Sequence, residues 1–286
     1  MSGEPPVAMT IAGSDSGSGA GVQADLKTMA AFGVLATTAV TAVTAQSTCE
    51  VTGIHAIPAA FVRLQVMTVL ADLPVAAVKT GLLGTAAVVR TVADLAGEGA
   101  LPNLVVDPVM VSSSGQALLD PDGVEAYREA LFPRALVVTP NLGEAALLCG
   151  ARVGDLVDVA SMTEAARCIG AGGATWVLVK GGHLPGVESG GPPHALVPDV
   201  LFGGGRVTVL EAGWVDTPNT HGTGCSLSAA ITAGLASGQT VPRAVEAARE
   251  YVHRALSGAA GWRIGSGHGP LDHLDWSGRE TGRGAG

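Results

Sequence analysis

A glycine-rich segment late in the chain has the composition of an anion-binding helix start. Residues Asn219–Cys225 read Asn-Thr-His-Gly-Thr-Gly-Cys, and a stretch rich in small residues follows them. Such a helix start leaves several backbone N–H groups without partners, and the helix dipole favours a negative group there. The pattern predicts an anion hole formed by Gly222, Thr223, Gly224 and Cys225. The structural alternative is a helix start in which the glycines only ease the backbone turn and the cysteine packs against its neighbours.

Cys225 lies within the first turn of that expected helix. Because the positive end of a helix stabilises a thiolate, we expect a depressed pKa for this thiol. A thiolate at this point could accept a proton from a neutral alcohol.

Charged and polar residues follow three short apolar runs that read as strands. Asp107 follows Leu104–Val106, and is either a metal ligand or a turn former beside Pro108. Lys180 follows Thr175–Val179, where its ammonium would reach a phosphate over the sheet edge. The alternative for Lys180 is an ordinary exposed lysine.

Asn141 and Glu144 follow a third such strand, Leu136–Thr139. Their spacing is that of a capping box variant, with Asn141 as the N-cap of a helix. A carboxylate at a strand's carboxyl end could instead hold Mg²⁺ through water. The residues alone favour the cap.

Gln46 comes at the end of another expected strand, in Ala45-Gln46-Ser47-Thr48. Its side-chain amide offers one acceptor and two donors in one plane. That pattern matches an aminopyrimidine edge, where an amino donor lies beside a ring-nitrogen acceptor. A merely polar strand end is the simpler interpretation.

Glycines in the segment Ala12–Gly21 would let the backbone approach a ligand closely. The segment is no dinucleotide fingerprint, because Gly17-x-Gly19 is followed by a misplaced third glycine, Gly21. It is no Walker loop either, since the chain contains no Gly-Lys pair. A structural strand-to-helix turn is equally compatible with it.

Short β-branched runs alternate with Ala/Leu-rich stretches along the whole chain. This alternation predicts an α/β fold with a largely parallel sheet, helices on both faces, and ligands at the carboxyl ends of the strands. Residues Ala195–Phe202 and Arg206–Glu211 flank three glycines and predict a β-hairpin. The expected strands are Val7–Ile11, Leu35–Thr44, Val75–Val78, Leu104–Val109, Leu136–Thr139 and Thr175–Val179. The expected helices are Gly21–Phe32, Pro58–Leu73, Thr85–Leu95, Gly123–Leu131, Leu142–Cys149, Met162–Ala171, Gly224–Ala236 and Val241–Ala259.

Composition limits the classes of protein that this chain can be. Of its 286 residues 14% are charged and 41 are glycine, and the net charge is −9. So few charges exclude a disordered chain. An acidic chain without basic clusters is also not expected to bind nucleic acid. Four cysteines without a CxxC pair favour a reducing cytosol over a zinc site or a disulfide framework.

No signal peptide or membrane span is evident, so a soluble cytoplasmic protein is expected. We find no composition shift that marks a domain boundary. The sequence therefore predicts one domain over residues 1–275 and a disordered tail over 276–286.

Taken together, these segments resemble the ribokinase-like vitamin kinases, and most closely the family of hydroxymethylpyrimidine/phosphomethylpyrimidine kinases. The resemblance covers roughly residues 7 to 273. It is carried by Thr10–Lys27, Thr44–Thr48, Lys79–Gly84, Asp107–Val111, Thr139–Glu144, Val179–His183, Asn219–Ser226 and Gly267–Pro270.

The resemblance implies a three-layer α/β/α fold and a cytoplasmic homodimer. It implies phosphorylation of 4-amino-5-hydroxymethyl-2-methylpyrimidine, then of its monophosphate, with ATP and Mg²⁺, for thiamin biosynthesis. Asp107 and Glu144 would organise Mg²⁺, while Lys180 and Asn141 would meet ATP. The pyrimidine pocket would be lined by Gly13, Asp25, Gln46, Leu82 and Val109, with Cys225 nearby.

Three positions depart from the family's usual residues. Ser47 replaces an asparagine, Leu82 a methionine, and Ser113 a lysine or threonine that often precedes Ser-Gly. Leu for Met conserves volume, whereas Ser113 removes one expected phosphate contact. A pyridoxal kinase is the alternative enzyme, although Gln46 and the long first loop favour the pyrimidine. A non-catalytic vitamin-binding module could dispense with the charged residues and the anion hole, all of which are present.

Overall fold

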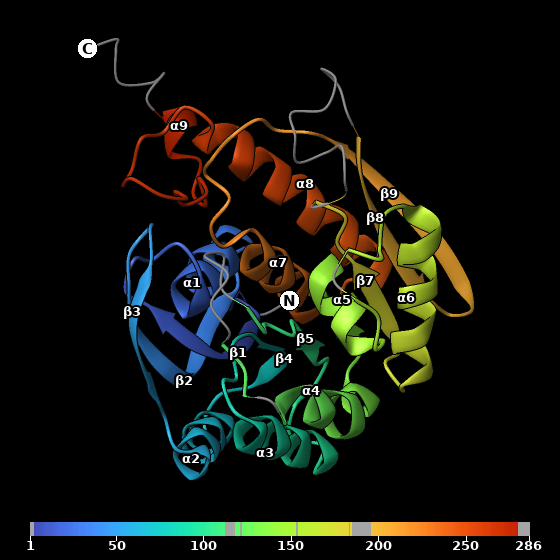
Figure 1. Cartoon of the computed structure of the whole chain (residues 1–286). Coiled ribbons are helices and arrows are strands. Elements are labelled where there is room, and N and C mark those ends of the chain that lie inside the picture. Colours follow the sequence, from blue (N-terminus) through green and yellow to red (C-terminus); the bar gives the residue numbers. More distant parts are fainter. Residues whose placement is uncertain are drawn as a thin grey trace.

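One mixed sheet runs through the centre of the molecule in the computed structural model (Figure 1). The structure describes residues 3–111, 118–120, 122–152, 154–182, 184 and 196–279. Ser113, His183 at the end of one family-matching segment, and the last seven residues of the expected tail lie outside these ranges.

Within the described residues the sheet has nine strands in the order β3-β2-β1-β4-β5-β6-β7-β8-β9. The strands β2-β1-β4-β5-β6-β7 are parallel, and β3, β8 and β9 are antiparallel to their neighbours. The expected α/β architecture with a mostly parallel sheet is thus confirmed. The strands are β1 (Val7–Asp15), β2 (Leu35–Gln46), β3 (Val51–Ala56), β4 (Val75–Thr80), β5 (Val105–Val106), β6 (Val137–Val138), β7 (Trp176–Val179), β8 (Leu196–Gly203) and β9 (Arg206–Gly213).

Helices cover both faces of this sheet, which gives three layers. Neighbouring strand residues point to opposite faces, so Val105 packs in the core under α7 and α8 and Val106 in the core on the other face. The face with α7 also carries α1, and the opposite face carries α2 to α6. The helices are α1 (Gly21–Ala31), α2 (Ala59–Leu70), α3 (Ala86–Gly97), α4 (Gly123–Ala126), α5 (Leu142–Leu148), α6 (Val159–Ala171), α7 (Thr223–Ala236), α8 (Val241–Ala259) and α9 (Trp276–Arg279).

Most expected elements are present, and the differences have local causes. The hairpin is confirmed as β8 and β9, and the bounds of α8 match the prediction. The expected strand Leu104–Val109 shortens to β5, because Pro108 has no N–H to continue a ladder. Strand β3 was not predicted, since five of its six residues are exposed and no buried alternation marks it. The expected helix Gly123–Leu131 begins as α4 and continues as a π-helical turn over Tyr127–Leu131.

The expected disordered tail begins too early, because residues 276–279 form helix α9. The carboxylate of Asp272 accepts hydrogen bonds from the N–H groups of Trp276 and Ser277, at 2.8 and 3.0 Å. The ring of Trp276 also packs against Trp262, with their centroids 6.0 Å apart. These contacts fix the start of α9 on the segment that follows α8, which composition alone does not reveal.

Among the helices in the described part of the chain, none is long and apolar enough to cross a bilayer.

Candidate active site

The residues with the expected chemistry gather at the carboxyl ends of the parallel strands. Asp107 directly follows β5, and Lys180 directly follows β7. The ammonium of Lys180 lies 3.0 Å from Asp107 Oδ1, which also accepts a hydrogen bond from Thr139 Oγ1 at 3.1 Å. Ser228 of helix α7 donates to Asp107 Oδ2 at 3.3 Å. The two strand ends and α7 therefore meet at this carboxylate.

The opposite charges of Asp107 and Lys180 stabilise each other. Burial alone raises the pKa of Asp107, but the ammonium groups of Lys180 and Lys79 outweigh it and hold that pKa below its ordinary value. Burial likewise lowers the pKa of Lys180, and the carboxylates of Asp107 and Glu144 reverse the effect and raise it. Lys180 therefore carries a positive charge over the sheet edge. It is not the ordinary exposed lysine of the alternative interpretation, because only 15% of its side chain is exposed.

Asn141 and Glu144 form the capping box that their spacing predicts. Asn141 Oδ1 accepts from Glu144 N at 2.9 Å, and Glu144 Oε2 accepts from Asn141 N at 2.8 Å. The cap also places Glu144 in the site, because Asn141 pairs with Lys180 in a short parallel bridge. The pKa of Glu144 is raised to about 7, mainly by burial. The charge of Lys180 opposes this rise, and the charge of Asp107 adds to it. Two carboxylates thus share one nearby ammonium.

The predicted anion hole is the start of helix α7. Gly222 is its N-cap with a φ of 89°, and its carbonyl accepts from Ser226 N at 2.8 Å. The next N–H groups, of Gly224 and Cys225, have no helical acceptor by the geometry of a helix start. The Cβ of a larger residue at position 224 would lie 3.1 Å from Lys180 Nζ. The helix start and the ammonium therefore favour a negative group at one place.

The expected depressed pKa of Cys225 is wrong for this arrangement. Burial of the thiol raises its pKa to about 11. The nearby ammonium of Lys79 and the N–H of Gly21 lower it, while the carboxylates of Asp25 and Asp107 raise it. At neutral pH the sulfur therefore carries its proton. Helix position suggested a thiolate, but burial and neighbouring carboxylates outweigh the helix dipole here.

Gly13 and Leu82 lie together beside Cys225. A Cβ on Gly13 would lie 3.0 Å from the end of the Leu82 side chain, so a larger residue would require that side chain to shift. Gly21 lies against the carbonyl of Gly13 and donates its N–H to the Cys225 sulfur. Val109, two residues after Asp107, donates its N–H to the Asp107 carbonyl at 2.9 Å. Whether Gly13, Leu82 and Val109 line a pyrimidine pocket stays a prediction.

Asp25 differs from the expectation that it lines the pocket. Its side chain is fully buried, and its oxygens accept from Thr10 Oγ1 at 2.6 Å and from the ammonium of Lys79. Burial alone lowers the pKa of Lys79, and Asp25, Cys225 and Asp107 together raise it above its ordinary value. The Asp25–Lys79 pair is therefore an ion pair beneath the site and not part of its surface. The pattern of the sequence does not show this pairing of α1 with β4.

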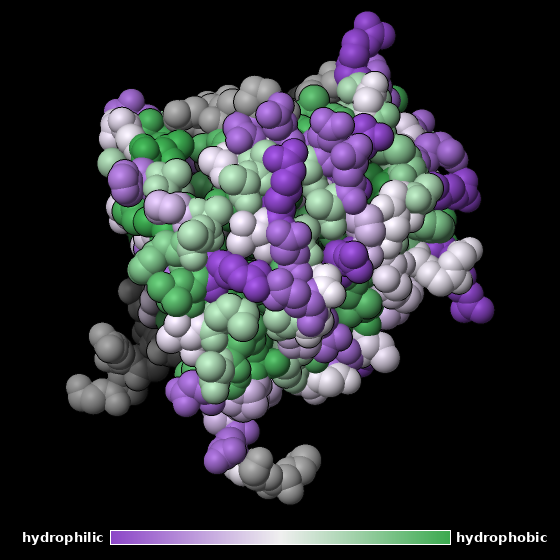
Figure 2. Space-filling model, turned by 90° about the horizontal axis from the view of Figure 1, so that it is seen from below, coloured by the Kyte–Doolittle hydropathy of each residue, from purple (hydrophilic) through white to green (hydrophobic). Residues whose placement is uncertain are grey.

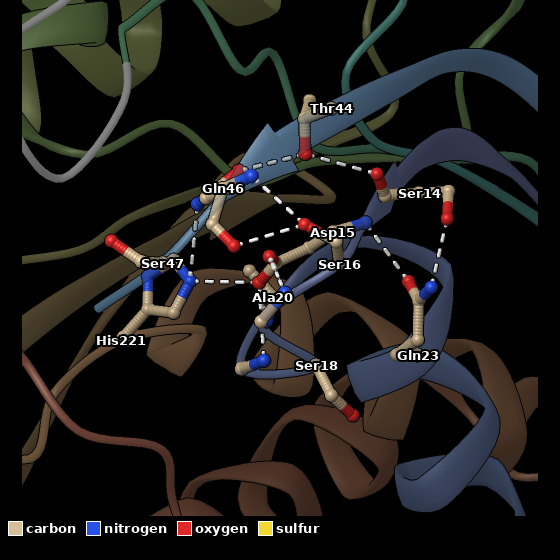
Figure 3. Close-up of polar contacts among 12 residues, drawn as sticks. Ser14, Asp15, Ser16, Ser18, Ala20, Gln23, Thr44, Gln46, Ser47 and His221 are labelled. Carbon is tan, nitrogen blue, oxygen red and sulfur yellow. Dashed lines mark hydrogen bonds and ion pairs between the residues drawn. The ribbon is translucent and has the colours of Figure 1, made fainter. Parts of the chain in front are cut away.

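Asp15 organises the first glycine-rich loop and was not predicted as a functional residue (Figure 3). Its carboxylate accepts from the N–H groups of Gly17, Gly19 and Ala20, at 2.8, 3.1 and 2.8 Å. It also lies 2.9 Å from Nε2 of His221, just before the anion hole. The sequence feature that could have indicated a role for Asp15 is an acidic side chain inside a glycine-rich turn. Its partner His221 is 206 positions away along the chain.

Gln46 lies at the end of β2, half-buried, beside this loop (Figure 3). Ser16 Oγ donates to the Gln46 carbonyl at 2.9 Å and accepts from its N–H at 2.8 Å, so the backbone is held from both sides. The side-chain amide reaches Thr44 and His221. The position of Gln46 is therefore fixed by the first glycine-rich loop, and its role in binding a pyrimidine stays a prediction.

The side chains present do not by themselves surround a metal ion. Among the described residues, no three His, Cys, Asp or Glu side chains gather closely enough to hold one. A cation at Asp107 and Glu144 would need oxygen ligands from a phosphate or from water as well.

Comparison with known proteins places this chain in a family. A family model described as phosphomethylpyrimidine kinase matches residues 15–272 of the chain. The hydroxymethylpyrimidine/phosphomethylpyrimidine kinase of Rhizobium meliloti (strain 1021) is 48% identical over 269 residues, which cover 94% of this chain and 97% of that protein.

Solved structures share the whole fold. A Bacillus subtilis pyridoxal kinase in an ADP complex has a TM-score of 0.83 and 38% identity, and the match covers 94% of this chain and 98% of the other. The phosphomethylpyrimidine kinase of Clostridium difficile 630 has a TM-score of 0.75 and 34% identity, over 88% and 100% of the two chains. Fold and sequence agree, and the chain belongs to the phosphomethylpyrimidine kinase family.

Proposed function

We propose that this protein transfers the γ-phosphoryl group of ATP to 4-amino-5-hydroxymethyl-2-methylpyrimidine, and then to the monophosphate that results. The observation that carries the proposal is the Lys180–Asp107 pair at the start of α7, where a Cβ on Gly224 would lie 3.1 Å from Lys180 Nζ. Backbone amides and one ammonium there would together bind a phosphate group. The family match and the ADP complex of the B. subtilis relative support this assignment.

Phosphoryl transfer requires mainly positioning and stabilisation of charge. The N–H groups at the start of α7 would bind the oxygens of the transferred group. Lys180 would bind the other phosphates, and Asp107 keeps its ammonium at the sheet edge. Asn141, in the bridge with Lys180, would lie beside the nucleotide.

The residues present fit a magnesium ion held between protein and phosphates. Asp107 and Glu144 supply hard oxygen donors, and they lie close enough for the charge of Asp107 to raise the pKa of Glu144 in addition to the larger effect of burial. Bound there with ATP, Mg²⁺ would neutralise phosphate charge. The capping box holds Glu144 ready for this role.

The two steps differ in their need for a base. The first nucleophile is a neutral alcohol, and we propose Cys225 as the group that takes its proton. Because the thiol is protonated at neutral pH, this step uses a small thiolate fraction. The second nucleophile is a phosphate oxygen with a pKa near 6, which needs no base at pH 7.

Turnover measured on three substrates tests the proposal. Hydroxymethylpyrimidine, its monophosphate and pyridoxal would be incubated separately with ATP and Mg²⁺, and each product identified by mass. We expect both pyrimidines to be phosphorylated with a higher kcat/KM than pyridoxal. Pyridoxal is included because a pyridoxal kinase shares 38% identity and the fold. Turnover of pyridoxal alone would refute the pyrimidine assignment.

We also propose a cytoplasmic homodimer. All four cysteines are free thiols, as suits a reducing compartment. Large apolar side chains are exposed at spacings of three along α2, and the molecule shows hydrophobic patches on the face that carries α2 and α3 (Figure 2). These exposed side chains are Phe61, Leu64 and Met67. Sedimentation of the native protein and of a Phe61→Ser/Leu64→Ser variant should give a dimer and a monomer, respectively.

A further inference from the structure

Four side chains from three separate segments meet beside the expected pyrimidine site (Figure 3). His221 Nε2 lies 2.9 Å from Asp15 Oδ2 and 3.3 Å from Gln46 Nε2. Thr44 Oγ1 lies 3.1 Å from the Ser14 carbonyl and 3.1 Å from Gln46 Oε1. Donors and acceptors must alternate through this cluster, which fixes where each proton lies.

Asp15 determines the proton on His221. Its carboxylate accepts three backbone N–H groups, and although burial alone raises its pKa, the hydrogen bonds from His221 and Ala20 leave that pKa below the ordinary value. An ionised carboxylate can only accept. Nε2 of His221 must therefore carry a proton and donate it to Asp15.

The amide of Gln46 then has a preferred orientation. With its nitrogen toward His221, two N–H donors face each other, and the single hydroxyl proton of Thr44 faces two acceptors. A turn of 180° about the last side-chain bond removes the donor–donor contact and gives the Thr44 proton a single acceptor. The Nε2 proton of His221 is then shared between Asp15 Oδ2 and the amide oxygen, the NH₂ group donates to Thr44 Oγ1, and Thr44 donates to the Ser14 carbonyl. The Gln46 backbone stays in place, since Ser16 holds it.

We propose that His221, held by Asp15, is a positioning residue that locks the Gln46 amide with its oxygen toward His221 and its NH₂ toward Thr44. The locked amide presents its remaining N–H and lone pair to the substrate in one fixed order. His221 is thereby a determinant of ring specificity, although it acts only through Gln46. This inference rests on the proposed function, in which Gln46 binds the aminopyrimidine edge.

The order of donor and acceptor separates two classes of ring. A 4-aminopyrimidine presents an amino N–H beside a ring-nitrogen acceptor. A 4-oxopyrimidine of the same shape presents a carbonyl acceptor beside a ring N–H, which is the reverse order. An amide locked in one orientation matches only the first class, because the second leaves polar groups facing like partners. A freely turning amide accepts both.

The experiment compares two substitutions at His221 with two substrates. The measured quantity is the ratio of kcat/KM for hydroxymethylpyrimidine to kcat/KM for its 4-oxo analogue. H221Q keeps an N–H donor at the position of Nε2, and H221L removes it. We expect H221Q to retain the wild-type ratio within about threefold. H221L should lower the ratio at least tenfold, mainly through a lower KM for the 4-oxo analogue. A general effect on the anion hole changes kcat for both substrates and cancels in the ratio.

Thr44 provides a second test away from helix α7. T44V removes the other partner of the amide and should also lower the ratio, even if a His221 variant fails to fold. An unchanged ratio in H221L or T44V, or an equal loss in H221Q and H221L, overturns the lock. Failure of the wild-type protein to phosphorylate either pyrimidine overturns the proposed function, and the inference with it.

Discussion

At the scale of single residues, the environment of Cys225 shows how a side chain's chemistry depends on more than its place in a helix. A position in the first turn stabilises a thiolate, yet burial and two nearby carboxylates raise the pKa to about 11. Only about one thiol in ten thousand is ionised at pH 7 with such a pKa. The thiol's contribution to catalysis should therefore grow with pH.

The pH dependence of the two phosphorylation steps tests this. Between pH 7 and 9 we expect the rate of alcohol phosphorylation to rise about tenfold per unit, because the thiolate fraction does so. The rate with the monophosphate should stay flat, since that nucleophile is already ionised. Single-turnover rates of the wild type and of Cys225→Ala would be compared. Persistence of the slope in Cys225→Ala would mean that another group takes the proton.

Alkylation gives an independent measure of the same pKa. Labelling of Cys225 by iodoacetamide should be slow at pH 7 and accelerate up to about pH 11. The exposed thiols of Cys49 and Cys168 serve as internal controls in the peptide mass map. Faster labelling of Cys225 than of both controls at pH 7 would contradict the raised pKa.

At the scale of elements, the start of α7 depends on one glycine. Gly222 has a φ of 89°, and a Cβ there would come within 1.9 Å of the Gly19 carbonyl. Both the backbone conformation and the contact with the first loop therefore require glycine. The residue joins the anion hole to the loop that Asp15 organises.

Gly222→Ala should lower kcat/KM by at least a hundredfold, because the N–H groups at the helix start must shift. Gly238→Ala is the matched control. Gly238 follows the other end of α7 with a φ of 81° and has open space at the Cβ position. Both variants carry backbone strain of about 1–3 kcal/mol, but only the first disturbs the site. Equal activity losses in steady-state assays would show that strain alone is responsible.

The buried Asp25–Lys79 pair connects α1 with β4, and Thr10 of β1 donates to the same carboxylate. Lys79→Met should reduce the free energy of unfolding by about 3–5 kcal/mol, because it leaves Asp25 buried without a countercharge. Asp25→Asn/Lys79→Met should regain at least half of that loss. Urea unfolding followed by circular dichroism measures both. A double variant no more stable than Lys79→Met would argue against an ion pair.

At the scale of the whole molecule, His273 ties the end of the chain to the start of α7. Its Nε2 lies 2.9 Å from Ser226 Oγ, and its Nδ1 is buried with no hydrogen-bond partner in the described residues. Burial lowers the pKa of His273 to about 4, and the charge of Lys27 adds to the effect. The folded protein therefore disfavours the protonated imidazole.

This depressed pKa predicts how stability changes with pH. The unfolded chain binds a proton at His273 near pH 6.5, and the folded protein only near pH 4, so folding is weakened as the pH falls through that window. Between pH 7 and 5 this group should lower the free energy of unfolding by about 2 kcal/mol. Wild type and His273→Phe would be compared by urea unfolding at both values. The same pH dependence in the two proteins would exclude His273 as its source.

Much of the architecture follows from the sequence alone. Alternating β-branched and helical stretches determine the mostly parallel sheet with helices on both faces, and the apolar stripe of α8 determines its bounds. Glycine spacing marks the anion hole, and the positions of Asp107 and Lys180 after strands place them at one edge. These features depend on local propensity and on a period that a short window contains.

The tertiary structure decided which charges meet and how deeply they lie. Asp25 is buried in an ion pair with Lys79, and His221 contacts Asp15, which lies 206 positions away along the chain. Strand β3 forms only because β2 offers it a partner. Burial and pairing over such distances depend on how the layers pack, and no local pattern encodes them. The same packing raises the pKa of Cys225 and brings the Gln46 amide to His221, so the sequence indicated the candidate residues and the fold determined their contacts and protonation.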